Sequence, residues 1–148
     1  MNPVLAHIPT PGLMTVSPRF AASVGAADTL GHGTGDRVLK HVADYISRQV
    51  READYVFRLG GDEFLVLMSC DEAEAARTAH ELQTAFPPTL ASSGLPLGLG
   101  ISVGVAEVPS DTRDIVASIQ EADTRMYADK RRRAAADPLG VRLKPDAT

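Results

Sequence analysis

Two short apolar segments joined by a tight turn constrain the fold more than any other feature of this sequence. Residues 55–59 alternate as in a half-buried strand, and residues 64–68 are apolar throughout, as in a central strand. Only four residues, Gly60-Gly61-Asp62-Glu63, separate the two segments. Strands joined by so short a connection must run antiparallel, because a parallel pair needs a long crossover. The sequence therefore excludes a doubly wound parallel sheet.

Segments on the N-terminal side of the hairpin predict one strand and one helix. Residues 13–16 fit a short strand that Pro18 ends. Apolar residues recur at helical spacing over 38–50, with Asp36 as the N-cap after a glycine-rich turn at 31–35.

Segments on the C-terminal side predict two helices around one strand. Asp71 and Glu74 resemble a capping box, and the helix that they begin ends before Pro87. A strand follows over 97–106, and Thr112 can cap a last helix. The inner face of that helix would carry Ile115, Ile119, Ala122 and Met126. A final edge strand would contain Val141 and Leu143. This order predicts an α/β sandwich of the ferredoxin-like kind, with a mostly antiparallel sheet flanked by helices.

Composition narrows the classes of function. The 148 residues suit one domain, and 15 basic against 19 acidic residues give a net charge of −4, which argues against binding to a nucleic acid polymer. A single cysteine excludes an internal disulfide and a cysteine-based zinc site. Neither a signal peptide nor an apolar run long enough for a membrane is evident. We expect a soluble, cytoplasmic domain.

The turn of the hairpin gathers the residues with the most chemical potential. Its two glycines allow a ligand to approach the backbone closely, and Asp62 and Glu63 follow directly. Magnesium takes oxygen ligands, commonly one or two carboxylates together with substrate phosphates. The alternative is a plain solvent-exposed hairpin turn without a ligand.

The string Arg58-Leu-Gly-Gly-Asp-Glu-Phe64 resembles the signature of the GGDEF domain family, the diguanylate cyclases. Residues 31–36, 101–106 and 122–130 resemble other segments of that family, so the likeness covers about residues 28–133. It implies a fold similar to the palm of nucleotidyl cyclases. It also implies condensation of two GTP molecules into cyclic di-GMP by two domains that face each other, with metal ions assisting the transfer.

The resemblance assigns roles to several residues. Asp62 corresponds to a metal ligand, and Asp62 and Glu63 correspond to catalytic positions. Asp36 would read guanine, which suits a carboxylate facing two N–H donors, although it could be only a helix cap. The remaining nucleotide-binding positions are Gly60, Gly61 and Lys130, of which Lys130 could instead be a solvated cation at a helix end.

A second implied site would bind the product. Arg51-Glu-Ala-Asp54 matches the family's inhibitory R-x-x-D motif in composition and in its distance from the signature, and we assign Arg51, Asp54 and Arg58 to cyclic di-GMP. An arginine fork can grip phosphate or the edge of guanine. The alternative is a surface ion pair worth less than about 1 kcal/mol.

The chain departs from the family pattern before the hairpin. Residues 1–27 contain no Asp or Glu, and Arg19 stands where the first strand of the family supplies a metal carboxylate. A cation there would repel magnesium, so we expect magnesium to bind weakly, if at all. The other departures are Val24 for the phosphate lysine, Ala27 for the guanine-reading asparagine, Leu59 for a tyrosine and Ala134 for an arginine.

Three functions stay open on this basis. The first is a regulatory module that binds cyclic di-GMP or guanine nucleotide with weak or no cyclase activity. The second is an active diguanylate cyclase, and the third is a dimerisation module without a nucleotide. We expect an arm at 1–12, a GGDEF domain at 13–143 and a tail at 144–148. We also expect a homodimer and a sensory or receiver module in a longer chain.

Overall fold

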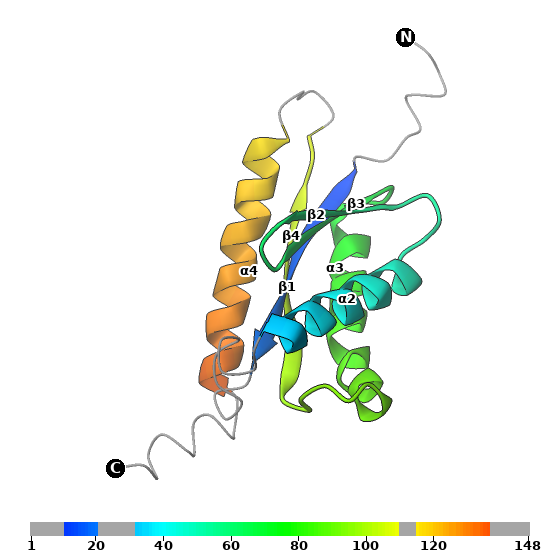
Figure 1. Ribbon diagram of the computed structural model, residues 1–148. Coiled ribbons are helices and arrows are strands. Elements are labelled where there is room, and N and C mark those ends of the chain that lie inside the picture. The colour runs from blue at the N-terminus through cyan, green and yellow to red at the C-terminus, as the bar shows by residue number, and fades with distance from the viewer. Residues whose placement is uncertain (1–10, 21–31, 110–114, 137–148) are drawn as a thin grey trace.

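The computed structural model describes residues 11–20, 32–109 and 115–136. Their elements follow the predicted order of strand, helix, hairpin, helix, strand and helix (Figure 1). The elements are β1 (Gly12–Phe20), α2 (His32–Gln49), β2 (Tyr55–Gly60), β3 (Glu63–Met68), α3 (Glu72–Ala85), the 3-10 helix η2 (Pro87–Ser92), β4 (Leu99–Glu107) and α4 (Val116–Ala136).

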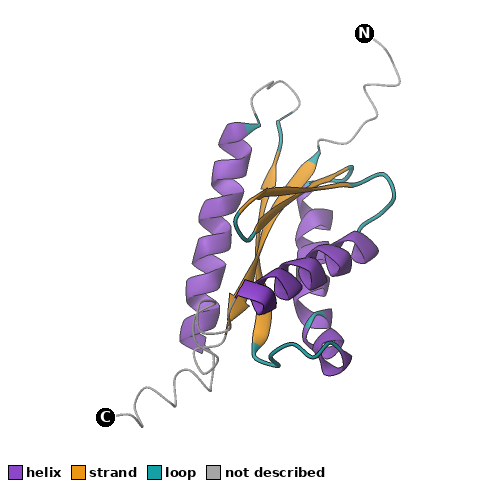
Figure 2. Ribbon diagram, in the orientation of Figure 1, coloured by secondary structure: helices purple, strands orange, loops and turns teal. Residues whose placement is uncertain are grey.

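The four strands form one antiparallel sheet in the order β2-β3-β1-β4. Helices α2 and α3 cover one face of this sheet and α4 covers the other (Figure 2). The α/β sandwich predicted from the hairpin is therefore confirmed, and β3 lies inside the sheet as its apolar sequence predicts.

The two faces of the sheet bury cores of different size. The larger core lies under α2 and α3, where Val42 and Ile46 meet the even-numbered residues of β1 and β3. The smaller core lies under α4, where Ala122 meets Leu13 and Leu65. Alternation along β1 and β3 therefore sends Thr15, Ser17 and Glu63 to the α4 face.

The backbone of α4 lies directly on β4 at Gly104. A Cβ atom at this position would overlap the carbonyl oxygen of Ala122 and crowd the amide nitrogen of Met126. Only glycine allows this approach, and the approach fixes the height of α4 above the sheet.

Two predicted boundaries are wrong. Helix α2 begins at His32, so Gly33 and Gly35 are helical and Asp36 lies inside the helix and is not its N-cap. Each helical glycine costs about 1 kcal/mol, which the burial of the inner face of α2 can offset. Strand β1 continues through Pro18 to Phe20. Beyond Val16 it pairs only with β4, and a proline is tolerated beside such an open edge.

The start of α3 agrees with the sequence. Asp71 is the N-cap, and its carboxylate accepts a hydrogen bond of 2.8 Å from the amide of Glu74. The predicted cap at Thr112, the predicted strand around residues 141–143 and the predicted arm and tail lie mostly or wholly outside the described residues.

We expect opposite effects from alanine at two glycines. Gly104→Ala should cost more than about 3 kcal/mol of folding free energy, because the added Cβ meets backbone that has no room to move. Gly35→Ala should gain up to about 1 kcal/mol, because nothing lies within 4 Å of its Cβ position and alanine favours a helix. Urea unfolding of both variants measures this, and a mild effect of Gly104→Ala would contradict the packing.

Candidate functional site

The β2–β3 hairpin presents the signature turn at its tip. Gly60 and Gly61 have φ angles of 137° and 53°, which glycine adopts without strain. The guanidinium of Arg58 donates to the carbonyl of Gly61 from Nε at 3.0 Å and from Nη2 at 2.5 Å. No atom crowds either glycine, so the backbone of the turn is open to a ligand. Asp62 is exposed at the same tip.

Glu63 meets a carboxyl group from α4. Its side chain is hydrogen-bonded to Asp123, which lies sixty residues later in the chain. Burial raises the pKa of Glu63 to about 7, and the bond to Asp123 and the charges of Asp123 and Asp62 act in the same direction. Glu63 therefore keeps its proton up to about neutral pH.

Strand β1 adds no carboxylate to this group. Val16 pairs with Phe64, so Ser17 comes next beside Glu63, and Arg19 follows two residues further on the same face. Arg19 pairs with Gly100, whose lack of a side chain leaves room for the guanidinium. Among residues 11–20, 32–109 and 115–136, no group of three or more His, Cys, Asp or Glu could hold a metal ion. The tip therefore offers Asp62 and Glu63 with no carboxylate from β1 opposite them, and this donor set does not fit a magnesium site shared between the hairpin and β1.

A hollow of about 290 Å³ lies between α2 and the hairpin. Asp36 and Arg58 both line it, with Phe64 in its wall. The structure thus brings together two of the residues predicted to contact ligands. A carboxylate and an arginine in one hollow can accept from and donate to the polar edge of a purine.

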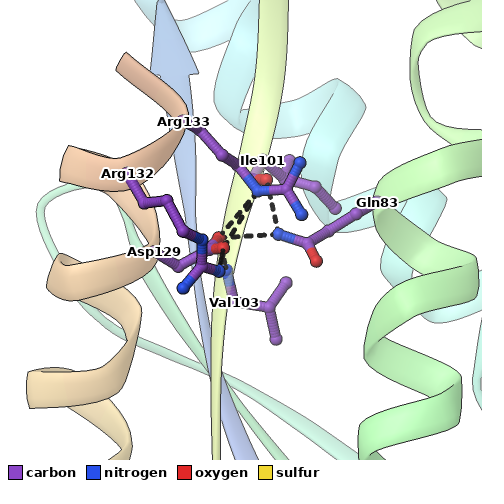
Figure 3. A network of polar contacts seen from close by, with 6 residues as sticks. All are labelled: Gln83, Ile101, Val103, Asp129, Arg132 and Arg133. Atoms are coloured by element: carbon purple, nitrogen blue, oxygen red, sulfur yellow. Dashed lines mark hydrogen bonds and ion pairs between the residues drawn. The ribbon is translucent and has the colours of Figure 1, made fainter. Parts of the chain in front are cut away.

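The last turns of α4 are held by a buried carboxylate at the outer edge of β4 (Figure 3). Asp129 accepts from the Val103 amide at 3.2 Å and from Gln83 Nε2 at 2.7 Å. It also pairs with Arg132 and Arg133. Gln83 comes from α3 and donates as well to the Ile101 carbonyl at 3.2 Å, so α3 and α4 meet around β4.

This network sets the position of Lys130, the next residue of α4. Lys130 is half-buried, and no hydrogen bond or ion pair among the described residues joins it to the hairpin tip. The sequence did not point to Asp129 or Asp123, because both act through contacts distant in the chain. The only sign of them in the sequence was that Asp123 and Asp129 fall at helical spacing among the apolar residues of α4.

The Arg51–Asp54 motif lies at the opposite end of β2 from the tip. The side chain of Asp54 is 0% exposed, and its two oxygens accept from the amides of Arg51 at 2.8 Å and Ser69 at 3.3 Å. Arg51 is 53% exposed, and its guanidinium donates to the Ser69 carbonyl at 3.1 Å. Asp54 therefore holds the turn, and Arg51 is the member of the pair that a ligand can reach.

Comparison with known proteins shows the same family along most of the chain. The family model described as diguanylate cyclase, GGDEF domain, matches residues 25–135. Diguanylate cyclase DosC of Escherichia coli strain K12 is 39% identical over 108 residues, which are 71% of this chain and 23% of DosC. This chain therefore spans about a quarter of the length of that relative.

Solved structures agree in fold. The GGDEF domain of YfiN, also called TpbB, from Pseudomonas aeruginosa is 31% identical, with a TM-score of 0.71 over 87% of this chain and 81% of that chain. The coiled coil and GGDEF domain of DgcB from Caulobacter crescentus, solved in complex with cyclic di-GMP, is 26% identical. Its TM-score is 0.60 over 82% of this chain and 65% of that chain.

Glu63→Gln should flatten the dependence of stability on pH. The folded chain keeps a proton on Glu63 up to about pH 7, whereas the unfolded chain releases it near 4.5. Folding stability is therefore lost as the pH rises through this window. Relative to Glu63→Gln, the wild-type Tm should fall between pH 5 and 8 by on the order of a few degrees. Parallel Tm profiles of the two proteins would refute the raised pKa of Glu63.

Asp129→Asn should cost about 2–4 kcal/mol of folding free energy, because the amide turns donors toward donors and leaves two arginines without their carboxylate. Glu121→Gln on the same helix is the matched control, since it removes only an exposed ion pair to Arg125 and should cost under about 1 kcal/mol. Chemical denaturation compares them, and equal losses would argue against the network.

Proposed function

The chain belongs to the GGDEF domain family, and on that premise we propose that it binds cyclic di-GMP, or a guanine nucleotide, as a regulatory module with weak or no cyclase activity. The observation that carries this proposal is the contrast between the two ends of β2. The Arg51 end keeps an ordered, accessible arginine, while the hairpin end lacks a carboxylate from β1.

The surroundings of Arg51 support binding of a base and a phosphate together. Ser69, which accepts from Arg51, also lines an apolar hollow of about 260 Å³ with Tyr55 and Leu67 in its wall. Tyr55 is 65% exposed and stacks on Phe57 with ring centroids 6.3 Å apart, and an exposed aromatic ring of this kind can stack on a planar base. Arginine donors beside such a surface suit a guanine nucleotide, whose phosphate and base they can both contact.

The surroundings of Asp62 support weak catalysis. A metal ion that activates a hydroxyl and neutralises phosphates needs its ligands in a fixed arrangement. Ser17 and Arg19 occupy the β1 positions beside Glu63, and Glu63 is already bonded to Asp123. We propose that magnesium binds weakly here, if at all. We also propose that cyclase activity is weak or absent, because the loss of one catalytic group commonly costs two or more orders of magnitude in rate.

An active cyclase is the second candidate, and the open backbone at Gly60 and Gly61 favours it. In that case another group would have to complete the metal site. A dimerisation module without a nucleotide is the third candidate. It would be favoured if the chain bound no guanine nucleotide at all.

Assembly and context are also proposals. We propose that the domain works in a longer chain beside a sensory or receiver module, and that two copies can pair. None of the described helices has the length and apolar character needed to cross a membrane.

Calorimetric titration with cyclic di-GMP tests the proposal. We expect saturable binding that Arg51→Ala weakens at least tenfold and that Tyr55→Ala weakens several-fold. Arg48→Ala is the matched control, because it removes the same side chain from an exposed position in the last turn of α2. Absence of binding, or an equal loss in Arg48→Ala, would overturn the Arg51 site.

A further inference from the structure

A second hollow, of about 230 Å³, lies along α2 beside the Asp36–Arg58 hollow, and Lys40 lines both. One wall is the helix face that carries Arg37, Lys40, His41 and Asp44. The other wall is the segment at 93–95 that follows η2. Two cations, Arg37 and Lys40, against the single carboxylate of Asp44 make this a positively charged recess in a chain of net charge −4.

The His41 ring is held in place by two neighbours. The hydroxyl of Thr89 donates its only proton to the Phe86 carbonyl at 2.7 Å, and its oxygen lies 2.9 Å from His41 Nε2. The Thr89 hydroxyl therefore bridges the His41 ring and the Phe86 carbonyl. The ring of Phe86 packs edge-on against the imidazole at 5.7 Å, which fixes the ring plane.

Arg37 is also held in place. Its Nη2 donates to the Ser93 carbonyl at 3.1 Å, and Gly94 adopts a φ of 75° beside it. A Cβ at Gly94 would lie 3.0 Å from this same Nη2, so the loop is shaped to admit the guanidinium. One N–H bond is used on Ser93, and four guanidinium donors remain for a ligand.

Lys40 and Asp44 complete the lining of the recess. No hydrogen bond or ion pair from the described part of the chain holds the Lys40 ammonium or the Asp44 carboxylate. Two cations, one of them fixed, thus face a recess whose walls leave their donors available. Phosphate is the ligand that fits these donors best, because its oxygens can accept hydrogen bonds from arginine and lysine together.

We propose that this recess, formed by Arg37, Lys40 and His41 against residues 93–95, binds the phosphate group of a small phosphate-bearing molecule. Its volume is below the usual range of about 300–1,000 Å³ for whole small-molecule sites. It therefore takes a phosphate or pyrophosphate group, free or attached to a nucleotide, rather than an entire dinucleotide. This site is independent of the Arg51 site and of the proposed function.

Titrations with inorganic pyrophosphate and with GMP at low ionic strength, followed by residue-resolved NMR, test the proposal. We expect the Gly94 amide and the His41 ring to shift together and to saturate. Arg37→Gln should raise the Kd at least threefold, and Asp44→Asn should lower it, because the two changes alter the charge of this recess in opposite directions and neither residue lines the Asp36–Arg58 hollow. Comparing the two probes distinguishes free phosphate from an esterified one.

Arg48→Gln is the matched control, since it makes the same charge change on the same helix away from the recess. It should leave the Kd nearly unchanged. Equal effects of Arg37→Gln and Arg48→Gln would overturn the site in favour of general attraction. Shifts confined to Ala43 and Phe64 would overturn it too, because they would place the anion in the Asp36–Arg58 hollow.

Discussion

The close packing of α4 on the backbone of β4 at Gly104 is the contact on which the rest of the site depends. A helix that approaches so closely can reach the sheet with short acidic side chains. Asp123 meets Glu63 on the hairpin, and Asp129 accepts the Val103 amide at the outer edge of β4. Three attachments therefore fix α4 against the sheet, and with it the backbone of Lys130.

The arrangement separates two kinds of chemistry along one short strand. The signature turn lies at one end of β2 and Arg51 lies at the other, about 20 Å away for six extended residues. The missing carboxylate of β1 affects only the turn, because β1 approaches Glu63 through Ser17. The absence of a β1 carboxylate at the turn thus leaves the hydrogen bond between Arg51 and Ser69 intact.

Local rules predicted the elements whose stability is local. The hairpin follows from its alternation and short turn, and the start of α3 follows from the Asp71 cap. The same rules predicted that the glycines before Asp36 would precede the helix and that Pro18 would end the first strand. Instead α2 includes Gly33 and Gly35 and β1 includes Pro18, because tertiary packing outweighs the local preference. For the site, the position of the signature turn was predictable, but the bond between Glu63 and Asp123 was not. It joins residues sixty apart, and only the packing of α4 sets their distance.

The most direct test of the account is incubation of the concentrated protein with GTP and magnesium, followed by chromatographic separation of the nucleotides. Concentrated protein matters because the family's reaction needs two domains facing each other. The account predicts that GTP survives with little or no cyclic di-GMP, since β1 offers serine and arginine where a second metal carboxylate is needed. Steady accumulation of cyclic di-GMP would contradict it.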